Sequence, residues 1–271
     1  QRELLLQQVR ELVAEPISDE ELEAHFATLP PRYFEIHTVR EILDDLELTH
    51  RFMHRLVLEK NRALSPVTAW LDEPDRGYNV VKVCTWDRAG LFGKIAGSLS
   101  AAGLNILSAQ IFTRSDGIVL DSFFVNDART GNLAAREQHD MFAGLLERVL
   151  NGEVVDLSAL IARQITNRPV YQPYAGERMP TEIQFDNDAA ETRTLIEIET
   201  EDQLGLLYAI SQTFSELEVD IDGARIVTER GAAIDSFYVR ELDGGKIVSP
   251  ERQKFIEASL RNAISQFVAV P

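Results

Sequence analysis

The sequence predicts an α+β protein, in which a helical lead-in over residues 1–76 is followed by two related units with antiparallel sheets. Two observations carry this prediction. The hydrophobic period changes from helical to extended at Tyr78, and the pattern that begins there occurs a second time further along the chain. The length of 271 residues also suits two domains of ordinary size.

The lead-in has the pattern of consecutive helices. Apolar residues recur at helical spacing up to Pro16. Two capping boxes follow, at Ser18–Glu21 and Thr38–Glu41, and each opens a helix. The first of these helices ends before Pro30, and the second is predicted to end near Asn61. The lead-in is too short to bury a large core of its own.

Each of the two units contains a β-rich strand, a turn and an amphipathic helix, then a strand hairpin and a second helix. A shift of 115 positions places Thr85, Asp87, Gly90, Leu91, Ile95, Ile106, Ala109, Ile111 and Thr113 on Thr200, Asp202, Gly205, Leu206, Ile210, Ile221, Ala224, Ile226 and Thr228. After a one-residue deletion in the hairpin, Asp121–Val125 matches Asp235–Val239. The order of elements predicts a βαββαβ unit of the ferredoxin-like kind, present twice.

The unit boundaries are predicted at residues 77–190 and 191–271. The last strand of the second unit is expected at Gln266–Val270, after a helix over residues 250–264. In the first unit a helical piece, Leu157–Ile165, and a Pro-containing loop follow Asn151, so the fourth strand is expected at Thr181–Phe185. Residues 152–180 are either a linker or an ordered insertion.

The composition excludes several classes of function. With 27 basic and 44 acidic residues the net charge is −17, which argues against nucleic-acid binding, including by an RNA-recognition sheet of the same fold. The single cysteine, Cys84, allows neither an internal disulfide nor a thiolate metal cage, and its place in a strand predicts a buried, inert thiol. No membrane span or signal peptide is recognisable, so we expect a cytoplasmic protein. Because the chain begins at Gln1, we expect it to be a segment of something longer.

The turn Asp87–Leu91 is the first candidate for chemistry. Gly90 allows positive φ or close approach of a ligand, and the N-terminus of the following helix offers unpaired N–H groups to a carboxylate. Asp87 can cap the helix, and its carboxylate beside these N–H groups suits the ammonium and carboxylate of an amino acid. The same features also fit a plain N-cap that any such fold needs.

A βαββαβ unit with an Asp-Arg-Ala-Gly-Leu turn resembles the ACT domain, a small-molecule sensing module that usually responds to amino acids. The tandem pair is similar to the carboxy-terminal end of bacterial PII-protein uridylyltransferase/uridylyl-removing enzymes. Segments that carry this resemblance are Leu29–Phe34, Pro180–Glu182, Phe185–Asp188, Asp202–Tyr208, Asp235–Val239 and Asp243–Ile247. The resemblance covers the chain from about Leu12 to its end.

The resemblance implies that a ligand lies between the turn of one unit and the start of the second strand of its neighbour. The ligand-binding candidates are therefore the two turns, Asp87, Arg88, Ala89, Gly90 and Leu91 with Asp202, Gln203, Leu204, Gly205 and Leu206, and the two strand starts, Asn105 with Ile106 and Asp220 with Ile221. An equally good interpretation of Asn105 and Asp220 is that each is an ordinary turn residue that ends the preceding helix. The second turn departs from the Arg-Pro common in the family, so the two sites can differ in affinity, or one can be vestigial.

The family's catalytic motifs are not recognisable in this sequence. Neither a Gly-rich turn followed by a Ser-Asp-x-Asp metal pair nor a spread set of His and Asp ligands is found. His139 with Asp140, and His50 with His54, lack further ligands nearby and favour surface or packing roles over a metal site. We expect no catalytic residue, metal or cofactor in this chain. The resemblance implies Mg²⁺ and UTP for the parent enzyme.

Two hypotheses follow. The first is a regulatory module that senses an amino acid, glutamine by the resemblance, and acts allosterically in nitrogen metabolism on catalytic domains outside this chain, with the PII signal protein as the partner of the parent enzyme. The second is a stand-alone amino-acid sensor or protein-interaction module. Either could form a homo-oligomer through its sheets. Asp121 and Asp235 lie in otherwise apolar strands, where alternation allows each to face solvent, so they need not be catalytic carboxylates.

Overall fold

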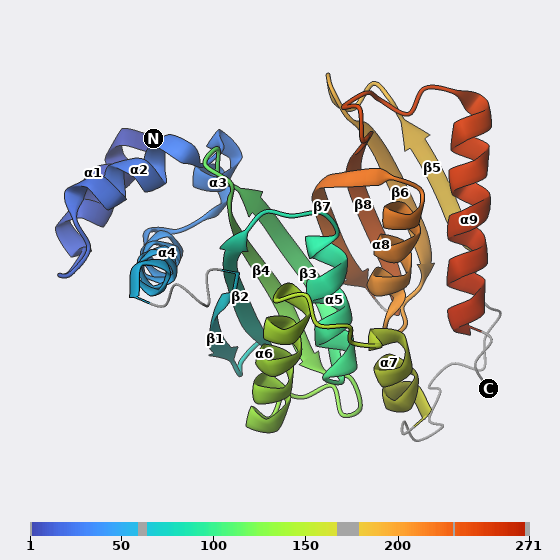
Figure 1. Cartoon of the computed structure of the whole chain (residues 1–271), viewed down its shortest axis with the longest axis horizontal. Coiled ribbons are helices and arrows are strands. Elements are labelled where there is room, and N and C mark those ends of the chain that lie inside the picture. The colour runs from blue at the N-terminus through green and yellow to red at the C-terminus, as the bar shows by residue number, and fades with distance from the viewer. Residues whose placement is uncertain (1, 59–63, 167–178, 230, 269–271) are drawn as a thin grey trace. The chain divides into compact units, whose positions relative to one another are not determined.

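The computed structural model describes residues 2–58, 64–166, 179–229 and 231–268 (Figure 1). It divides into two compact units, unit 1 with residues 1–71, 81–87 and 111–122, and unit 2 with residues 72–80, 88–110 and 123–271. The strands are β1 (Val67–Glu73), β2 (Tyr78–Trp86), β3 (Leu104–Thr113), β4 (Ile118–Asp127), β5 (Glu182–Asp186), β6 (Thr194–Glu201), β7 (Val219–Glu229) and β8 (Ala232–Glu241). They pair in the order β1-β2-β4-β3-β7-β8-β6-β5.

Unit 1 contains the helices that the sequence predicts and one more. They are α1 (Arg2–Leu12), α2 (Asp19–Thr28), α3 (Pro31–Ile36) and α4 (Val39–Leu58). Both predicted capping boxes are confirmed, because Glu21 N–H donates to Ser18 Oγ at 3.2 Å and Glu41 N–H donates to Thr38 Oγ1 at 3.3 Å. The short helix α3 was not predicted. It starts at Pro31, a position where a proline loses only an N–H that has no helical partner.

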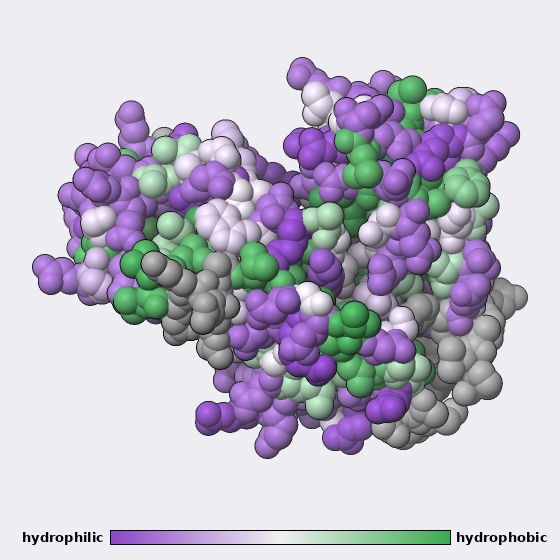
Figure 2. All heavy atoms as spheres, viewed as in Figure 1, coloured by the Kyte–Doolittle hydropathy of each residue, from purple (hydrophilic) through white to green (hydrophobic). Residues whose placement is uncertain are grey.

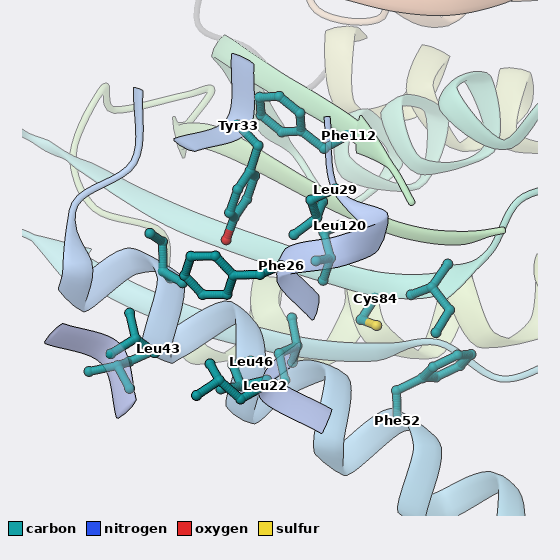
Figure 3. Packing of buried hydrophobic residues seen from close by; sticks show 14 of the residues in the cluster. Leu22, Phe26, Leu29, Tyr33, Leu43, Leu46, Phe52, Cys84, Phe112 and Leu120 are labelled. Carbon is teal, nitrogen blue, oxygen red and sulfur yellow. The ribbon is translucent and has the colours of Figure 1, made fainter. Parts of the chain in front are cut away.

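The core of unit 1 joins these helices to the strand residues of the same unit (Figure 3). The Tyr33 ring meets Phe112 of β3 edge-on at 5.3 Å between centroids, and Phe52 of α4 meets Trp86 of β2 at 5.6 Å. Cys84 of β2 is fully buried in the same cluster, and burial raises the pKa of its thiol, so the prediction of a buried, inert thiol agrees with the structure. The lead-in helices thus share their core with strand residues, as expected for a segment too short to bury one alone.

A buried ion pair lies in unit 1. Lys82 Nζ is 2.6 Å from Asp45 Oδ1, and the Tyr33 hydroxyl donates to Asp45 Oδ2 at 2.7 Å. The Lys82 and Asp45 side chains are 5% and 4% exposed. Because both carboxylate oxygens have a donor, the cost of burying the Asp45 charge is offset by its partners.

Unit 2 contains the whole second repeat and part of the first, whose four strands are divided between the two units. Its helices are α5 (Leu91–Ala101), α6 (Arg136–Leu150), α7 (Leu157–Thr166), α8 (Leu206–Glu216) and α9 (Pro250–Val268). Helices α5 and α8 begin and end 115 positions apart, and β4 and β8 begin and end 114 positions apart, as the repeat predicts. The α+β class with two ferredoxin-like units and antiparallel pairing is confirmed.

The predicted fourth strands are wrong in position. The strand expected at Thr181–Phe185 forms as β5, but it pairs with β6 of the second repeat instead of completing the first. The edge place beside β2 is taken by β1, which was not predicted. Residues 266–268 continue helix α9 instead of forming the final strand, and the remainder of that predicted strand lies outside the described residues. Each repeat therefore has the element order ββαββα, and its edge strand is the first strand. The edge strand is joined to the next strand by four residues (74–77) in the first repeat and by seven (187–193) in the second. Closing such short hairpin loops costs little conformational entropy.

Part of the inserted segment is ordered, because residues 157–166 form helix α7. This agrees with the alternative of an ordered insertion. Leu157 and Ile161 pack with Ala101 of α5 and Tyr208 of α8. The Gln164 carboxamide donates to the Ala101 carbonyl at 3.1 Å. Residues 167–178 of the predicted loop lie outside the described residues. Hydrophilic residues cover most of the face seen in Figure 2, in keeping with the acidic composition.

Candidate functional site

Two repeat-related turns lead from a strand into a helix, residues 87–91 before α5 and residues 202–206 before α8. Each has a glycine at the helix N-cap in the left-handed region, Gly90 with φ 69° and Gly205 with φ 87°. A side chain would strain that conformation, which explains glycine at both places. The first helical N–H donates to the carbonyl three residues earlier at 3.1 Å in the first turn and 3.0 Å in the second. The predicted positive φ at Gly90 is confirmed.

Helices α5 and α8 pack closely enough to bring the two repeats together inside unit 2. A Cβ added at Gly93 would lie 3.0 Å from the Ser211 Cβ, and one at Gly97 would lie 2.6 Å from the Tyr208 ring. Residues later in α5 thus lie opposite residues earlier in α8, so the helices are antiparallel. The end of α5 and the start of β3 therefore come near the turn that opens α8.

Asn105, at the start of β3, meets Asp202 of the opposite repeat. Asn105 Nδ2 donates to Asp202 Oδ2 at 3.4 Å, a contact at the long end of hydrogen bonding, and both side chains are half-buried. The turn of the second repeat and the second strand of the first therefore lie side by side in unit 2. The sequence led us to expect a ligand between these two elements. Their proximity agrees with that expectation, and ligand binding itself stays a prediction.

The two turns differ in how far the protein covers them. In the second turn, Leu204, Gly205 and Leu206 are buried, and Asp202 and Gln203 before them are half-buried. In the first turn most residues are exposed: Asp87, Ala89 and Gly90 are exposed, Arg88 is half-buried and Leu91 is buried. The N-cap of α5 is Gly90, so Asp87 does not occupy the cap position itself. The second turn is the more enclosed of the two.

Arg88, one of the ligand-binding candidates, contacts its own repeat. Its guanidinium donates to the Leu150 carbonyl at 2.8 Å, at the end of α6. Cations are stabilised near a helix C-terminus because carbonyl groups there have no helical partners. Arg88 thus has a structural contact that accounts for its charge.

Asp220, the counterpart of Asn105, lies in an ion-pair network that the sequence did not reveal. It is the direct cross-strand partner of Arg240 in β8. The Arg240 guanidinium donates to Asp220 Oδ2 at 3.1 and 3.3 Å and also lies 3.1 Å from Asp222 Oδ1. The neighbouring candidates are Ile221, half-buried at a register shift in β7, and Ile106, buried in β3. Only the register of β7 against β8 brings Arg240 onto Asp220.

Asp121 and Asp235 do not face solvent, although strand alternation allows it. They are 2% and 1% exposed. Burial, and then the charge of Asp202, raises the pKa of Asp235 to about 8, while burial raises the pKa of Asp121 well above its ordinary value. Each accepts a backbone N–H from the adjacent strand, Asp121 from Phe112 at 3.3 Å and Asp235 from Val227. Around Asp235 in β8 buried positions alternate with more exposed ones, so packing decided which face its side chain occupies, whereas residues 118–123 of β4 are all buried and neither face there meets solvent.

The histidines do not form a metal site among the described residues, and no group of three or more potential ligands occurs there. His50 Nδ1 lies 2.7 Å from Glu21 Oε1, and its ring stacks on that of His54 at 5.9 Å. His25 is fully buried, and burial lowers its pKa to about 3, so its ring is neutral. These contacts are compatible with packing roles.

Comparison with known proteins gives a consistent answer. A family model described as ACR9-like, ACT-like domain matches residues 182–271. The chain is 34% identical over 254 residues to the bifunctional uridylyltransferase/uridylyl-removing enzyme of Rhodospirillum rubrum, covering 92% of this chain. It is 32% identical over 229 residues to that of Gluconobacter oxydans and 34% over 216 residues to that of Azospirillum brasilense, covering 84% and 78% of the chain. This chain is homologous to the carboxy-terminal region of the bifunctional uridylyltransferase/uridylyl-removing enzymes.

The uridylyltransferase relatives are much longer than this chain, which covers 27% of the Rhodospirillum, 24% of the Gluconobacter and 22% of the Azospirillum protein. The resemblance recognised in the sequence is confirmed, and the site described above lies within the homologous region. Over the described residues, no helix combines the length and the apolar character that crossing a membrane requires.

Proposed function

We propose that this chain is a regulatory amino-acid-binding module, with glutamine as its ligand, and that binding acts allosterically on the uridylyltransferase and uridylyl-removing activities for which its relatives are named. The observation that carries the proposal is the meeting of Asn105 with Asp202 at the N-terminus of α8, inside a region homologous to those enzymes.

The groups at this position match an amino acid. The Asp202 carboxylate can accept from the α-ammonium, and N–H groups in the first turn of α8 other than that of Leu206, which bonds to Gln203, can donate to the α-carboxylate. The Asn105 carboxamide both donates and accepts, so it can pair with the carboxamide of glutamine. A net charge of −17 disfavours polyanionic ligands more than a zwitterion.

Binding would regulate by favouring one arrangement of the protein over another. Coupling between sites typically amounts to about 1–3 kcal/mol, a change in affinity of roughly 5- to 150-fold. Within this proposal the PII signal protein, Mg²⁺ and UTP belong to the parent enzyme. A cytoplasmic location and a homo-oligomer formed through the sheets are parts of the same proposal.

Thermal-shift measurements on the chain with each of the 20 amino acids test the function, followed by calorimetry with L-glutamine. Glutamate is the control ligand, because it has the same shape and lacks the carboxamide. We expect glutamine to raise the unfolding temperature, Asp202→Asn to weaken the effect, and Asp140→Asn, at an exposed position on α6, to leave it unchanged. Absence of stabilisation by any amino acid would contradict the proposal and favour a protein-interaction module.

A further inference from the structure

Helix α8 packs on one face of the strands of the second repeat (Figure 1). Phe237 of β8 lies on this face, because its ring meets that of Phe214 in α8 with 5.5 Å between centroids. Side chains alternate along a strand, so the neighbours of Phe237 point to the opposite face, which we call the outer face. On β5, β6 and β8 the outer face carries Glu182, Gln184, Asp186, Leu195, Glu197, Glu199, Glu201, Ile234, Ser236 and Tyr238.

In the first repeat the matching face of β2 lies in unit 1, under helix α4. Three residues of α4 contact three alternate residues of β2. The contacts are Asp45 with Lys82, at 2.6 Å between Oδ1 and Nζ, Thr49 with the Cys84 thiol, and Phe52 with Trp86, at 5.6 Å between ring centroids (Phe52 and Cys84 in Figure 3).

The spacing of these contacts shows how α4 lies on the strand. The helical residues are four and three positions apart, and the strand residues are two apart. Each step therefore advances about 5–6 Å along the helix and about 6.6 Å along the strand, which is nearly the same distance. Helix α4 runs along β2 in the same direction, with one side of the helix on the sheet.

The second repeat has acidic residues at the positions that α4 and its neighbours cover in the first. At the offset of 115, Val67, Lys82, Cys84 and Trp86 correspond to Glu182, Glu197, Glu199 and Glu201. The four residues of the first repeat are buried or half-buried, whereas three of the glutamates are exposed and Glu199 is half-buried. A surface that holds a helix in the first repeat is thus open to solvent in the second, with its charge changed.

Strand pairing concentrates the negative charge of the outer face. Glu182 of β5 is the direct cross-strand partner of Glu199 of β6. Like charges directly opposite one another destabilise a sheet. Among the described residues, no ion pair joins any of the four glutamates to a cation. The nearest arginine on the outer face of β7, Arg225, is the partner of Ser236 and brings one positive charge.

Apolar side chains lie among these charges. Ile234 of β8 is 41% exposed and is the direct partner of Glu199, and the half-buried Tyr238 is the partner of Leu195. A purely solvated surface usually has both signs of charge interspersed, whereas protein interfaces combine apolar residues with a charged rim. The outer face therefore fits a partner that is apolar and basic on the same side.

We propose that the outer face of the second repeat binds an amphipathic helix of a partner protein, with Lys or Arg at positions four and then three residues apart. The partner helix lies along β6 as α4 lies along β2, with the charges reversed, so that its cations meet Glu197, Glu199 and Glu201. A second copy of this chain is a poor occupant, because each copy has a net charge of −17. Amino-acid binding is not needed for this interaction, which goes beyond the proposed function.

Two labelled peptides of about 20 residues test the inference, both made of alanine, leucine and lysine in the same amounts. In one peptide lysine has the spacing of the contact residues of α4, and in the other the lysines are distributed around the helix. Fluorescence anisotropy measures the binding of each to the whole chain. The variant Glu197→Gln with Glu199→Gln is compared with Glu137→Gln with Asp140→Asn, which removes two charges from exposed positions of α6. Thermal unfolding shows whether each variant is folded.

We expect the patterned peptide to bind at least roughly fivefold more tightly than the other peptide. The variant at Glu197 and Glu199 should weaken its binding roughly fivefold or more, and the control variant by less than about twofold. Equal weakening by the two variants would show attraction to the overall charge of the chain and overturn the inference. Equal binding of the two peptides, or no binding of the patterned one, would overturn it as well. Calorimetry with L-glutamine on the same variants tests the proposed function separately.

Discussion

Replacing Gly97 by alanine measures how closely the two repeats pack. Gly97 lies inside α5, and a Cβ there would lie 2.6 Å from Cδ2 of Tyr208 and 2.9 Å from Cδ1 of Leu157. Neither distance is tolerated between real atoms, so the side chains of Tyr208 and Leu157, or the helices that carry them, must shift. Overpacking of this kind costs about 1–3 kcal/mol.

Helix propensity acts in the opposite direction, because alanine is favoured over glycine in a helix interior by about 1 kcal/mol. The matched control is Gly144→Ala in α6, where no atom lies within 4 Å of the added Cβ. Since both variants gain the same propensity, the difference between them isolates the cost of packing. We expect Gly144→Ala to be stabilised by about 1 kcal/mol and Gly97→Ala to be about 1–3 kcal/mol less stable than Gly144→Ala.

Urea unfolding followed by circular dichroism gives the free energies, and calorimetry gives the unfolding temperatures, with about 3 °C expected for each kcal/mol in a chain of this size. Equal stability of the two variants, within about 0.5 kcal/mol, would refute the close contact of α5 with α8 and α7. It would also remove the geometric basis for placing Asn105 opposite Asp202.

Three further predictions concern buried groups. Lys82→Met leaves the Asp45 carboxylate buried without its cation and should lower the free energy of unfolding by about 3–5 kcal/mol, whereas Lys254→Met, at an exposed position, should change it by less than about 0.5 kcal/mol in the same urea assay. Because the pKa of Asp235 is raised to about 8, the folded protein holds a proton that the unfolded chain releases above about pH 4, so stability falls as the pH rises from about 4 to 8, by up to roughly 1 kcal/mol per pH unit. Asp235→Asn should flatten that dependence in urea titrations at about pH 5 and pH 8, and an unchanged slope would show that the group is ionised in the fold. Cys84 is fully buried with a raised thiol pKa, so a thiol reagent should label it only at the rate of unfolding, and rapid labelling of the native chain would contradict its burial.

Much of the fold is determined locally and could be predicted from the sequence. Helix starts and tight turns depend on neighbouring residues, which is why the capping boxes at Ser18 and Thr38 and the glycine at the start of α5 could be predicted. The 115-residue repeat is visible because the same short patterns occur twice in the same order. The homology to the uridylyltransferase region also follows from ordered motifs, and the candidate residues Asn105 and Asp202 were found in this way.

Only the tertiary structure decided which strand completes each repeat, which carboxyl groups are buried and which candidate residue lies in an ion-pair network. The edge places went to β1 and β5, because either end of a repeat has a strand-forming segment and the pairing in space selects one. Asp235 could face either side of its strand until helix packing buried it, and Arg240 meets Asp220 only through the register of β7 against β8. Such choices depend on residues far apart in the sequence, and therefore the pattern of any one segment does not contain them.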